Sequence, residues 1–204
     1  MVKLLIRVSW VQIPSGPLFM IKREFRILGI DDSYRRGDKE TLIIGTILRG
    51  GQLLDGIITL KAKVDGDDAT ENLITAIKKS RHYGQIRCIM LNGIAVGGFN
   101  IIDINQLSQK TKFPVIVVIR KMPDFRKIEK ALGKIGQSEK MKLIKKAGKV
   151  YKAGKIYFQI SGISKNKAEE IIKLAATHSL IPEPIRLSHL IASGIVLGEN
   201  KPRA

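Results

Sequence analysis

The chain has 204 residues, which is enough for one well-buried domain. Lys and Arg outnumber Asp and Glu by 36 to 18, so the formal net charge at pH 7 is +18. An excess of this size attracts polyanions, and the two candidates are nucleic acid and an anionic membrane surface. No apolar segment approaches the roughly 20 residues that a membrane-spanning helix needs, so we expect no such helix.

The chain contains one cysteine, Cys88, which lies inside the apolar run Ile86–Leu91. A single cysteine excludes an intrachain disulfide and a zinc cluster built from cysteines, and it fits a reducing compartment. We therefore expect a cytoplasmic protein. No histidine is near Cys88 in the sequence, which favours a core residue over a nucleophile.

The sequence divides into three parts. Residues 1–19 do not resemble a signal peptide, because Arg7, Pro14 and Pro17 interrupt the apolar run and no small-residue cleavage site follows. We expect them to be a non-native or disordered leader, with translation starting at Met20 rather than Met1. Residues 20–198 then form a single domain, and residues 199–204 form a tail.

Strand and helix patterns follow one another along this domain. Short apolar or β-like runs predict strands at 26–33, 41–49, 52–64, 86–91, 114–119 and 156–161. Helical spacing predicts helices at about 68–81, 99–109, 165–177 and 184–194. Gly50-Gly51 is a hairpin signal between two of the strands. The order of these elements predicts an α/β layered domain.

Most of the positive charge lies in Lys121–Tyr157, which has 12 Lys and Arg residues against 3 Asp and Glu. The pattern predicts helices that are interrupted at Gly133 and Gly148. A surface with this charge would contact phosphate groups.

The run 26–33 ends in two adjacent carboxylates, Asp31 and Asp32. An ionised group at a buried strand end must be paired, hydrogen-bonded or bound to a metal, and ligands of open α/β sheets collect at strand ends. Successive side chains point to opposite faces of a strand, so at most one of the two faces a given site. The alternative is that both only begin the polar turn that follows.

Hydrolysis of a phosphodiester by a divalent metal needs two or three carboxylates that converge from different elements. Glu71, at a predicted helix start, could converge with Asp31. Asp68 and Glu71 also fit a capping box, which would make both structural. The remaining candidates are Asp32, Asp55, Asp65, Asp67 and Asp103.

Other catalytic patterns are missing from the sequence. There is no phosphate-binding glycine motif and no G-x-S-x-G elbow. The histidines His82, His178 and His189 are scattered, so we expect surface or packing roles for them rather than zinc binding.

Six segments together resemble an archaeal family, endonuclease dU, which is related to endonuclease V and its ribonuclease H-like fold. The segments are Ile27–Tyr34, Val64–Glu71, Ile89–Ile94, Gly98–Asp103, Val118–Pro123 and Pro182–Arg186. The resemblance implies a ribonuclease H-like α/β domain, with a mixed sheet flanked by helices. It also implies metal-dependent cleavage of DNA that contains deaminated bases, uracil in particular, in DNA repair.

The first-strand motif of endonuclease V, Gly-Val-Asp-Val-Ser-Tyr, is similar to Gly29–Tyr34. The resemblance thus implies that Asp31 binds Mg²⁺, or Mn²⁺, and that Glu71 matches the catalytic glutamate. The third carboxylate of that family opens an Asp-Gly turn, where this chain has Asn92-Gly93. Asn92 can ligate Mg²⁺ through its carbonyl, but it brings no charge and cannot act as a base. Asp103 or the Asp65–Asp68 cluster could supply the missing charge.

DNA, and possibly RNA, is the partner that the resemblance implies. An extruded base needs a pocket, for which Tyr34 and the loop 93–98 are the candidates. The expected nucleic-acid contacts are Tyr34, Arg35, Arg36, Arg49, Gly93, Gly97, Gly98, Lys121, Lys145, Lys146, Lys149 and Arg186. Arg186 could instead pair with Glu183.

Two other classes of protein would share these features. A catalytically weak or inactive nucleic-acid-binding protein of the same fold would explain Asn92 and the basic surface. A structural or ribosome-associated basic protein would explain the charge, but not the carboxylates at strand ends.

Overall fold

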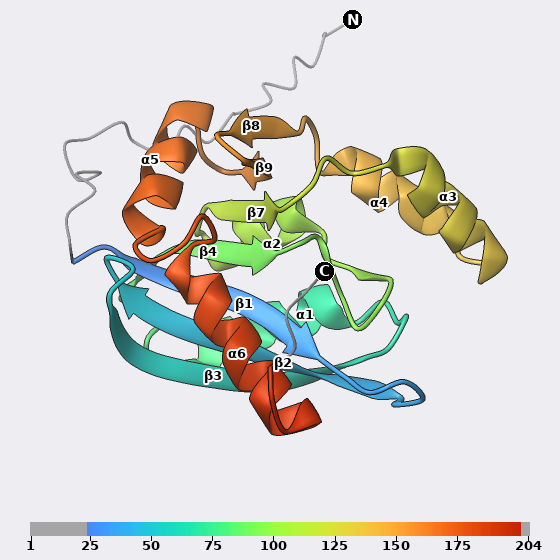
Figure 1. Cartoon of the computed structure of the whole chain (residues 1–204), viewed down its shortest axis with the longest axis horizontal. Helices are drawn as coiled ribbons and strands as arrows, with labels where there is room; N and C mark the ends of the chain where they lie inside the picture. The colour runs from blue at the N-terminus through green and yellow to red at the C-terminus, as the bar shows by residue number, and fades with distance from the viewer. Residues whose placement is uncertain (1–23, 201–204) are drawn as a thin grey trace, which may run out of the picture.

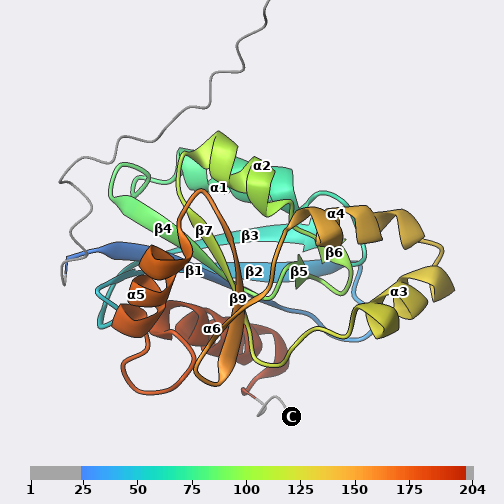
Figure 2. The ribbon, with the colours of Figure 1, turned by 90° about the horizontal axis from the view of Figure 1, so that it is seen from above.

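The computed structural model describes residues 24–200, and its centre is a mixed sheet with helices on both faces (Figures 1 and 2). The expected leader and the start at Met20 lie outside the described residues. The seven strands are β1 (Arg26–Ser33), β2 (Glu40–Arg49), β3 (Leu53–Lys63), β4 (Ile86–Asn92), β7 (Val115–Ile119), β8 (Tyr151–Ala153) and β9 (Ile156–Ser161). Their order in the sheet is β3-β2-β1-β4-β7-β9-β8.

The three central strands, β1, β4 and β7, are parallel, and all other neighbours are antiparallel. Parallel strands end at the same edge of a sheet, so Ser33, Asn92 and Ile119 mark one edge, which we call the site edge. In the β1–β4 register Ile30 is opposite Leu91, which places Asp31 beside Asn92.

Helices α1 (Ala69–Lys79) and α2 (Ile104–Thr111) cover one face of the sheet, and α5 (Lys165–Ala175) and α6 (Glu183–Leu197) cover the other (Figure 2). The residues of β1 alternate between the two cores. Leu28 and Ile30 belong to the core under α1 and α2. Ile27 belongs to the core under α5 and α6. A period of two is what a strand buried on both faces requires.

A helical arm extends from one end of the molecule (Figure 1). It consists of α3 (Phe125–Lys134), the short 3₁₀ helix η1 (Ser138–Lys140) and α4 (Met141–Lys146). We call it the basic arm. Its apolar residues Leu132, Met141 and Ile144 pack on Ile101, in a small core separate from the two above.

The strand predictions are confirmed apart from small shifts at their ends, and Cys88 is buried as expected. The helix predicted over 99–109 is wrong in its first part. Residues Ala95–Val96 and Asn100–Ile101 pair as the hairpin β5–β6, and the helix begins only at Ile104. Asp103 fixes that start, because its carboxylate accepts hydrogen bonds from the backbone of Asn105 and Gln106.

Strand β8 lies in the stretch that was predicted to be helical up to residue 157, and it pairs with β9. The last helix is longer than predicted and ends where Gly198 adopts a positive φ of 86°. Between residues 24 and 200 no helix is both long and apolar enough to cross a membrane.

Candidate active site

Asp31 lies near the end of β1 with its side chain almost fully buried. Its Oδ2 atom accepts a hydrogen bond from Asn92 Nδ2 at 2.9 Å and lies 2.8 Å from His189 Nδ1. These residues come from β1, β4 and α6, so three elements meet at this carboxylate. We refer to Asp31, Asn92 and His189 as the acid–imidazole cluster.

Helix α6 reaches Asp31 because it lies directly on the backbone of β1 (Figure 1). A Cβ atom at Gly29 would overlap the backbone of Pro184, so only glycine permits this approach. Ser188 strengthens the contact by donating to the carbonyl of Gly29 at 2.8 Å. One helical turn separates Ser188 from Pro184, and His189 follows on the side of Asp31.

The side chain of Asp32 lies on the other face of β1. Its Oδ2 atom accepts from Thr41 Oγ1 at 2.7 Å and from the backbone N–H of Gly97 at 2.8 Å. Asp32 therefore connects β2 to the loop 93–99. The expectation that the two neighbouring aspartates divide between the two faces agrees with these contacts.

Asp65 joins the same loop from the turn after β3. Its Oδ1 atom accepts from the backbone N–H of Phe99 at 2.8 Å, and its own N–H donates to Gly97 at 2.7 Å. Asp65 has a φ of 53°, which is uncommon for a residue other than glycine. A Cβ atom at Gly98 would overlap Asp65 Oδ1, so the loop is closely fitted here.

The hydroxyl of Tyr34 lies 3.5 Å from where a Cβ of Gly98 would be. Burial, followed by the negative charges of Asp32 and Asp65, raises the pKa of this hydroxyl. Tyr34 thus stays protonated at neutral pH and can donate a hydrogen bond. The residue as a whole remains 37% exposed. The predicted grouping of Tyr34 with Gly97 and Gly98 agrees with this arrangement.

Glu71 and Asp103 have partners outside the acid–imidazole cluster. Glu71 is exposed on α1 and accepts from Gln106 Nε2 of α2, on the opposite face of the sheet from α6. Asp103 caps α2, and its Oδ2 atom pairs with Lys146 Nζ at 2.6 Å. Burial acts to raise the pKa of Asp103, but the hydrogen bonds from Lys146 and from the backbone outweigh it, so the pKa lies below its usual range.

The capping-box prediction for Asp68 and Glu71 is wrong, because the side chain of Asp68 makes no cap hydrogen bond to α1. Its carboxylate instead accepts from the N–H of Lys63, from Asn72 Nδ2 and from Asn100 Nδ2. Asp68 thus ties the end of β3 to α1 and to the β5–β6 hairpin.

The arginines predicted to contact nucleic acid have different surroundings. Arg49 pairs with Asp55 at 2.9 Å. It is the last residue of β2 and lies opposite Arg26 at the start of β1, the end of β1 that is far from Asp31. Arg35 donates to the carbonyl of Val196 near the end of α6. Arg186 pairs with Glu183 at 2.7 Å, as the alternative expectation had it. Arg36 is exposed.

The predicted lysines are exposed and lie on or beside the basic arm. Lys121 follows β7 at the site edge, and Lys145 is on α4. Lys146 is the partner of Asp103, and Lys149 Nζ lies 5.7 Å from the centre of the Tyr151 ring. Gly93 has a φ of 91° in the turn directly after Asn92.

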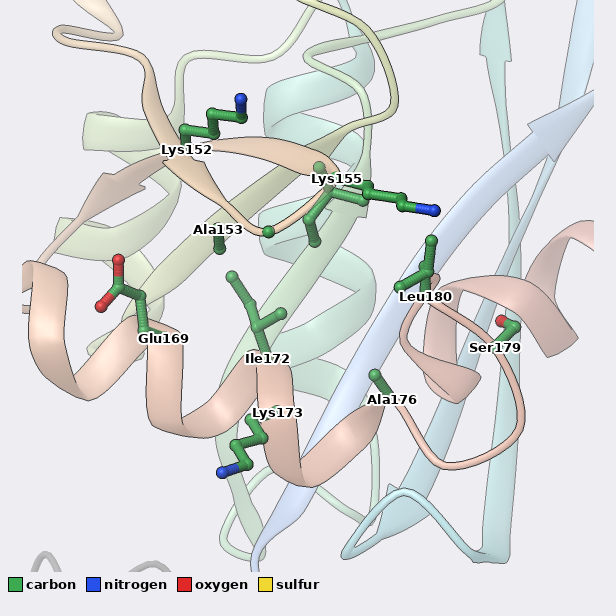
Figure 3. A pocket seen from close by; sticks show the side chains of 11 residues that line it. Lys152, Ala153, Lys155, Glu169, Ile172, Lys173, Ala176, Ser179 and Leu180 are labelled. Carbon is green, nitrogen blue, oxygen red and sulfur yellow. The ribbon is translucent and has the colours of Figure 1, made fainter.

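A hollow of roughly 480 Å³ lies elsewhere, between the β8–β9 hairpin, α5 and the loop that follows α5. Figure 3 shows Ala153, Ile172 and Leu180 around its middle, while the ammonium groups of Lys152, Lys155 and Lys173 point outward. None of the predicted site residues lines this hollow.

His189 is a candidate site residue that the sequence does not predict, since its pattern indicates a surface or packing role. Its neighbour in space, Asp31, is 158 residues away in the chain. The only signal in the sequence is indirect, since His189 stands one helical turn after the Pro182–Arg186 segment that carries part of the family resemblance.

Comparison with known proteins agrees with this architecture. The family model of endonuclease dU matches residues 23–196. A UPF0215 protein of Methanosarcina mazei is 49% identical over 193 residues, which cover 91% of this chain and 98% of that protein. A crystal structure from Archaeoglobus fulgidus is 38% identical with a TM-score of 0.80, and covers 84% of this chain and 98% of its own.

The fold is also similar to that of endonuclease V. The enzyme of Ciona intestinalis, solved with a DNA that contains inosine, aligns with a TM-score of 0.53 at 16% identity, covering 80% of this chain and 82% of its own. The fold is therefore of the ribonuclease H-like class, a mixed sheet flanked by helices. Within that class the chain belongs to the endonuclease dU family.

Proposed function

We propose that this chain is a metal-dependent endonuclease that cuts DNA containing deaminated bases, uracil in particular, and so serves DNA repair. The observation that carries the proposal is the convergence of Asp31, Asn92 and His189 at the site edge. Membership of the endonuclease dU family and the ribonuclease H-like fold support a nuclease that acts on DNA. The choice of uracil is an extension from the family alone.

Asp31 and Asn92 are the residues that would hold Mg²⁺ or Mn²⁺, because a carboxylate and an amide oxygen are ligands that such hard cations accept. An amide can present either its nitrogen or its oxygen. Asn92 donates to Asp31 through Nδ2, and a half-turn about its last side-chain bond would offer the oxygen instead. When bound, such an ion lowers the pKa of a water molecule and offsets the charge of a phosphate group.

His189 would handle the proton of the attacking water. Hydrogen bonding of Nδ1 to Asp31 holds the ring in place and leaves Nε2 as the acceptor in the neutral tautomer. The ring is mostly buried, with 13% of the side chain exposed, which limits its rotation. Glu71 and Asp103 are not part of this proposal, because they contact Gln106 and Lys146 instead.

Recognition of the base would fall to Tyr34 and the loop 93–98, next to the cluster. Tyr34 is an exposed residue whose ring could stack on a base, and its hydroxyl, with a raised pKa, can donate. Gly93 leaves room for a flat ring to approach the backbone, because nothing lies within 4 Å of where its Cβ atom would be. Lys121 and Lys145 would contact the flanking phosphates.

The second candidate is a protein of this fold that binds DNA without cutting it. Two observations favour it. The resemblance to endonuclease V implies a carboxylate at the place of Asn92, and no group of three His, Cys, Asp or Glu side chains suited to a metal occurs within residues 24–200.

The test is a cleavage assay on end-labelled oligonucleotides that differ at one position, which holds thymine, deoxyuridine or deoxyinosine. Each is incubated with Mg²⁺, with Mn²⁺ and with a chelator. The proposal expects a cut near deoxyuridine that needs the metal and that is lost in Asp31→Asn. Glu71→Gln is the matched control, since it also removes one carboxylate charge but should keep activity within about threefold.

The outcomes separate the candidates. Tight binding of all the oligonucleotides without any cut would support the binding protein. A cut that survives in Asp31→Asn but disappears in Glu71→Gln would move the metal site to the face of α1 and α2. Cleavage at deoxyinosine alone would retain the nuclease and reject the preference for uracil.

A further inference from the structure

Lys140 is the last residue of η1 in the basic arm, and its side chain is only 3% exposed. Its ammonium group donates to three backbone carbonyls, those of Asp65 (2.9 Å), Gly66 (2.7 Å) and Phe99 (2.9 Å). Asp67 Oδ1 lies 3.0 Å away as an ion-pair partner. A lysine is almost never buried unless such partners satisfy its charge and its three donors.

These acceptors belong to two separate loops. Asp65 and Gly66 are in the turn after β3, and Phe99 is in the loop after β5. The same two loops place Asp65 against the N–H of Phe99 and Gly98 beside Tyr34. Without a positive charge between them, carbonyl oxygens with their negative ends together would repel one another. The charge of Lys140 thus offsets the repulsion between the carbonyl oxygens of the two loops.

The basic arm is joined to the body at the same place. Met141 follows Lys140 directly, and Ile144 lies one turn further along in α4. Both pack against Ile101, and Phe99 is partly buried in the same small core. Gln137, three residues before Lys140, also donates to the carbonyl of Asp65, at 2.9 Å. The lysine-rich arm and the loop beside the acid–imidazole cluster are therefore held by one set of contacts.

We propose that Lys140 fills a cation site that the chain itself builds from the carbonyls of Asp65, Gly66 and Phe99 and the carboxylate of Asp67. The ammonium group takes the place that a monovalent metal ion of similar size, such as K⁺, would occupy in the emptied site. Carbonyl oxygens that replace a hydration shell are how proteins bind such ions. Lys140 is in this sense a positioning residue, which sets the loop 97–99 and the arm relative to Asp31.

Three variants separate the charge from the packing. Lys140→Ala empties the site and leaves room for an ion. Lys140→Met keeps a chain of similar length but fills the site without charge. Lys165→Met is the matched control, because it removes an exposed lysine of α5 that pairs with Glu169.

The first measurement needs no nucleic acid. Melting temperatures are compared in KCl, NaCl and LiCl at equal ionic strength. Lys140→Ala should melt lower than wild type by roughly 5 °C or more in LiCl and regain at least half of that loss in KCl. The melting temperature of Lys140→Met should be lowered equally in all three salts. The melting temperatures of wild type and Lys165→Met should be the same in all three salts.

The second measurement is amide hydrogen exchange by mass spectrometry. In LiCl, Lys140→Ala should exchange faster in the peptides that cover 64–68 and 97–103, and KCl should slow that exchange again. The role in positioning rests on the proposed function. On a substrate that wild type cuts, Lys140→Ala without K⁺ should lose kcat at least tenfold, with K⁺ restoring it, whereas the control keeps the wild-type value.

The outcomes are independent of the nuclease proposal. If wild type cuts nothing, the proposed function fails, and melting and exchange still decide the cation site. A variant Lys140→Ala that melts like wild type in every salt overturns the proposal. A melting temperature of Lys140→Ala that is lowered equally in all three salts, or failure of the variant to fold in every one of them, overturns it as well. Purification that succeeds only in potassium would be its strongest support.

Discussion

At the scale of single residues, two neighbouring carboxylates have different tasks because a strand turns them to opposite faces. Asp31 meets His189 and Asn92 on the side of α6. Asp32 connects Thr41 with the N–H of Gly97 on the other side. The first arrangement offers reactive groups, whereas the second organises a loop.

The first prediction concerns these two aspartates. Asp31→Asn should abolish metal-dependent cleavage. Asp32→Asn should keep cleavage measurable, because its side chain does not belong to the cluster. Loss of a buried acceptor should cost Asp32→Asn about 1–3 kcal/mol in the free energy of unfolding. Urea unfolding and the cleavage assay test both statements. If Asp32→Asn lost all cleavage while its stability was unchanged, Asp32 rather than Asp31 would be the residue needed for cleavage.

The sequence was sufficient for part of the cluster. Asp31 stands near the end of an apolar run, and ligands collect at such strand ends. Asn92, by contrast, is singled out only through the resemblance to endonuclease V. His189 could not be found from the pattern, because a helix face gives no information about which strand it will meet. The partner of Glu71 could not be predicted from the sequence for a related reason. Leu73, Ile74 and Ile77 turn the buried face of α1 to the sheet and leave Glu71 toward α2.

At the scale of elements, the contact between α6 and β1 decides whether the cluster exists. The second prediction is that Gly29→Ala lowers stability by about 3 kcal/mol, because the new Cβ overlaps the backbone of Pro184. Cleavage should fall with it, since α6 must move away and take His189 from Asp31. Gly84→Ala is the control, since no atom lies within 4 Å of where its Cβ would be. Equal behaviour of the two variants in urea unfolding would contradict the role of Gly29.

The third prediction concerns acid. Burial acts to raise the pKa of Asp68, but hydrogen bonds from Asn100, from Asn72 and from the backbone outweigh it, so the pKa is lowered in the folded state. The contribution to stability is therefore complete above the unfolded value of about 3.9 and is lost as the pH falls through the folded value.

Urea midpoints at pH 7, 5, 4 and 3 should therefore fall steeply below about pH 4 for the wild type. Asp68→Asn should start with a lower midpoint at pH 7 and show a shallower fall. A variant whose curve runs parallel to that of the wild type would show that Asp68 does not cause the acid loss.

The strands could be predicted from apolar periodicity because both faces of the central sheet are buried. The hairpin β5–β6 could not, since its strands have two residues each and are too short to show any period. What specifies them is tertiary: Asn100 accepts from the N–H of Ala69 and donates to Lys63 and Asp68. Such contacts cannot be read from local sequence.

At the scale of the whole molecule, the net charge of +18 should govern binding to nucleic acid. The fourth prediction is that the affinity for duplex DNA falls with salt on a log–log slope of about −0.9 per phosphate contact. Replacing Lys121, Lys145 and Lys149 by Ala should make that slope less steep by about two to three contacts.

The control has the same loss of charge outside the basic arm, with Ala in place of Lys78, Lys79 and Lys110 in the last turns of α1 and α2. Fluorescence anisotropy at four salt concentrations measures both slopes. If the control changes the slope as much as the first set, the charge acts as a whole and not through the basic arm.

The distance of 158 residues between Asp31 and His189 also bears on how the protein folds. The hairpins β1–β2 and β2–β3 join residues close in the chain, so they can form early. The contact of α6 with β1 closes a far longer loop of chain. The entropy lost in closing this loop is offset only when α6 packs on the assembled sheet. A collapsed intermediate would therefore have its strands but not its cluster. The appearance of activity during refolding should then trail the recovery of β structure.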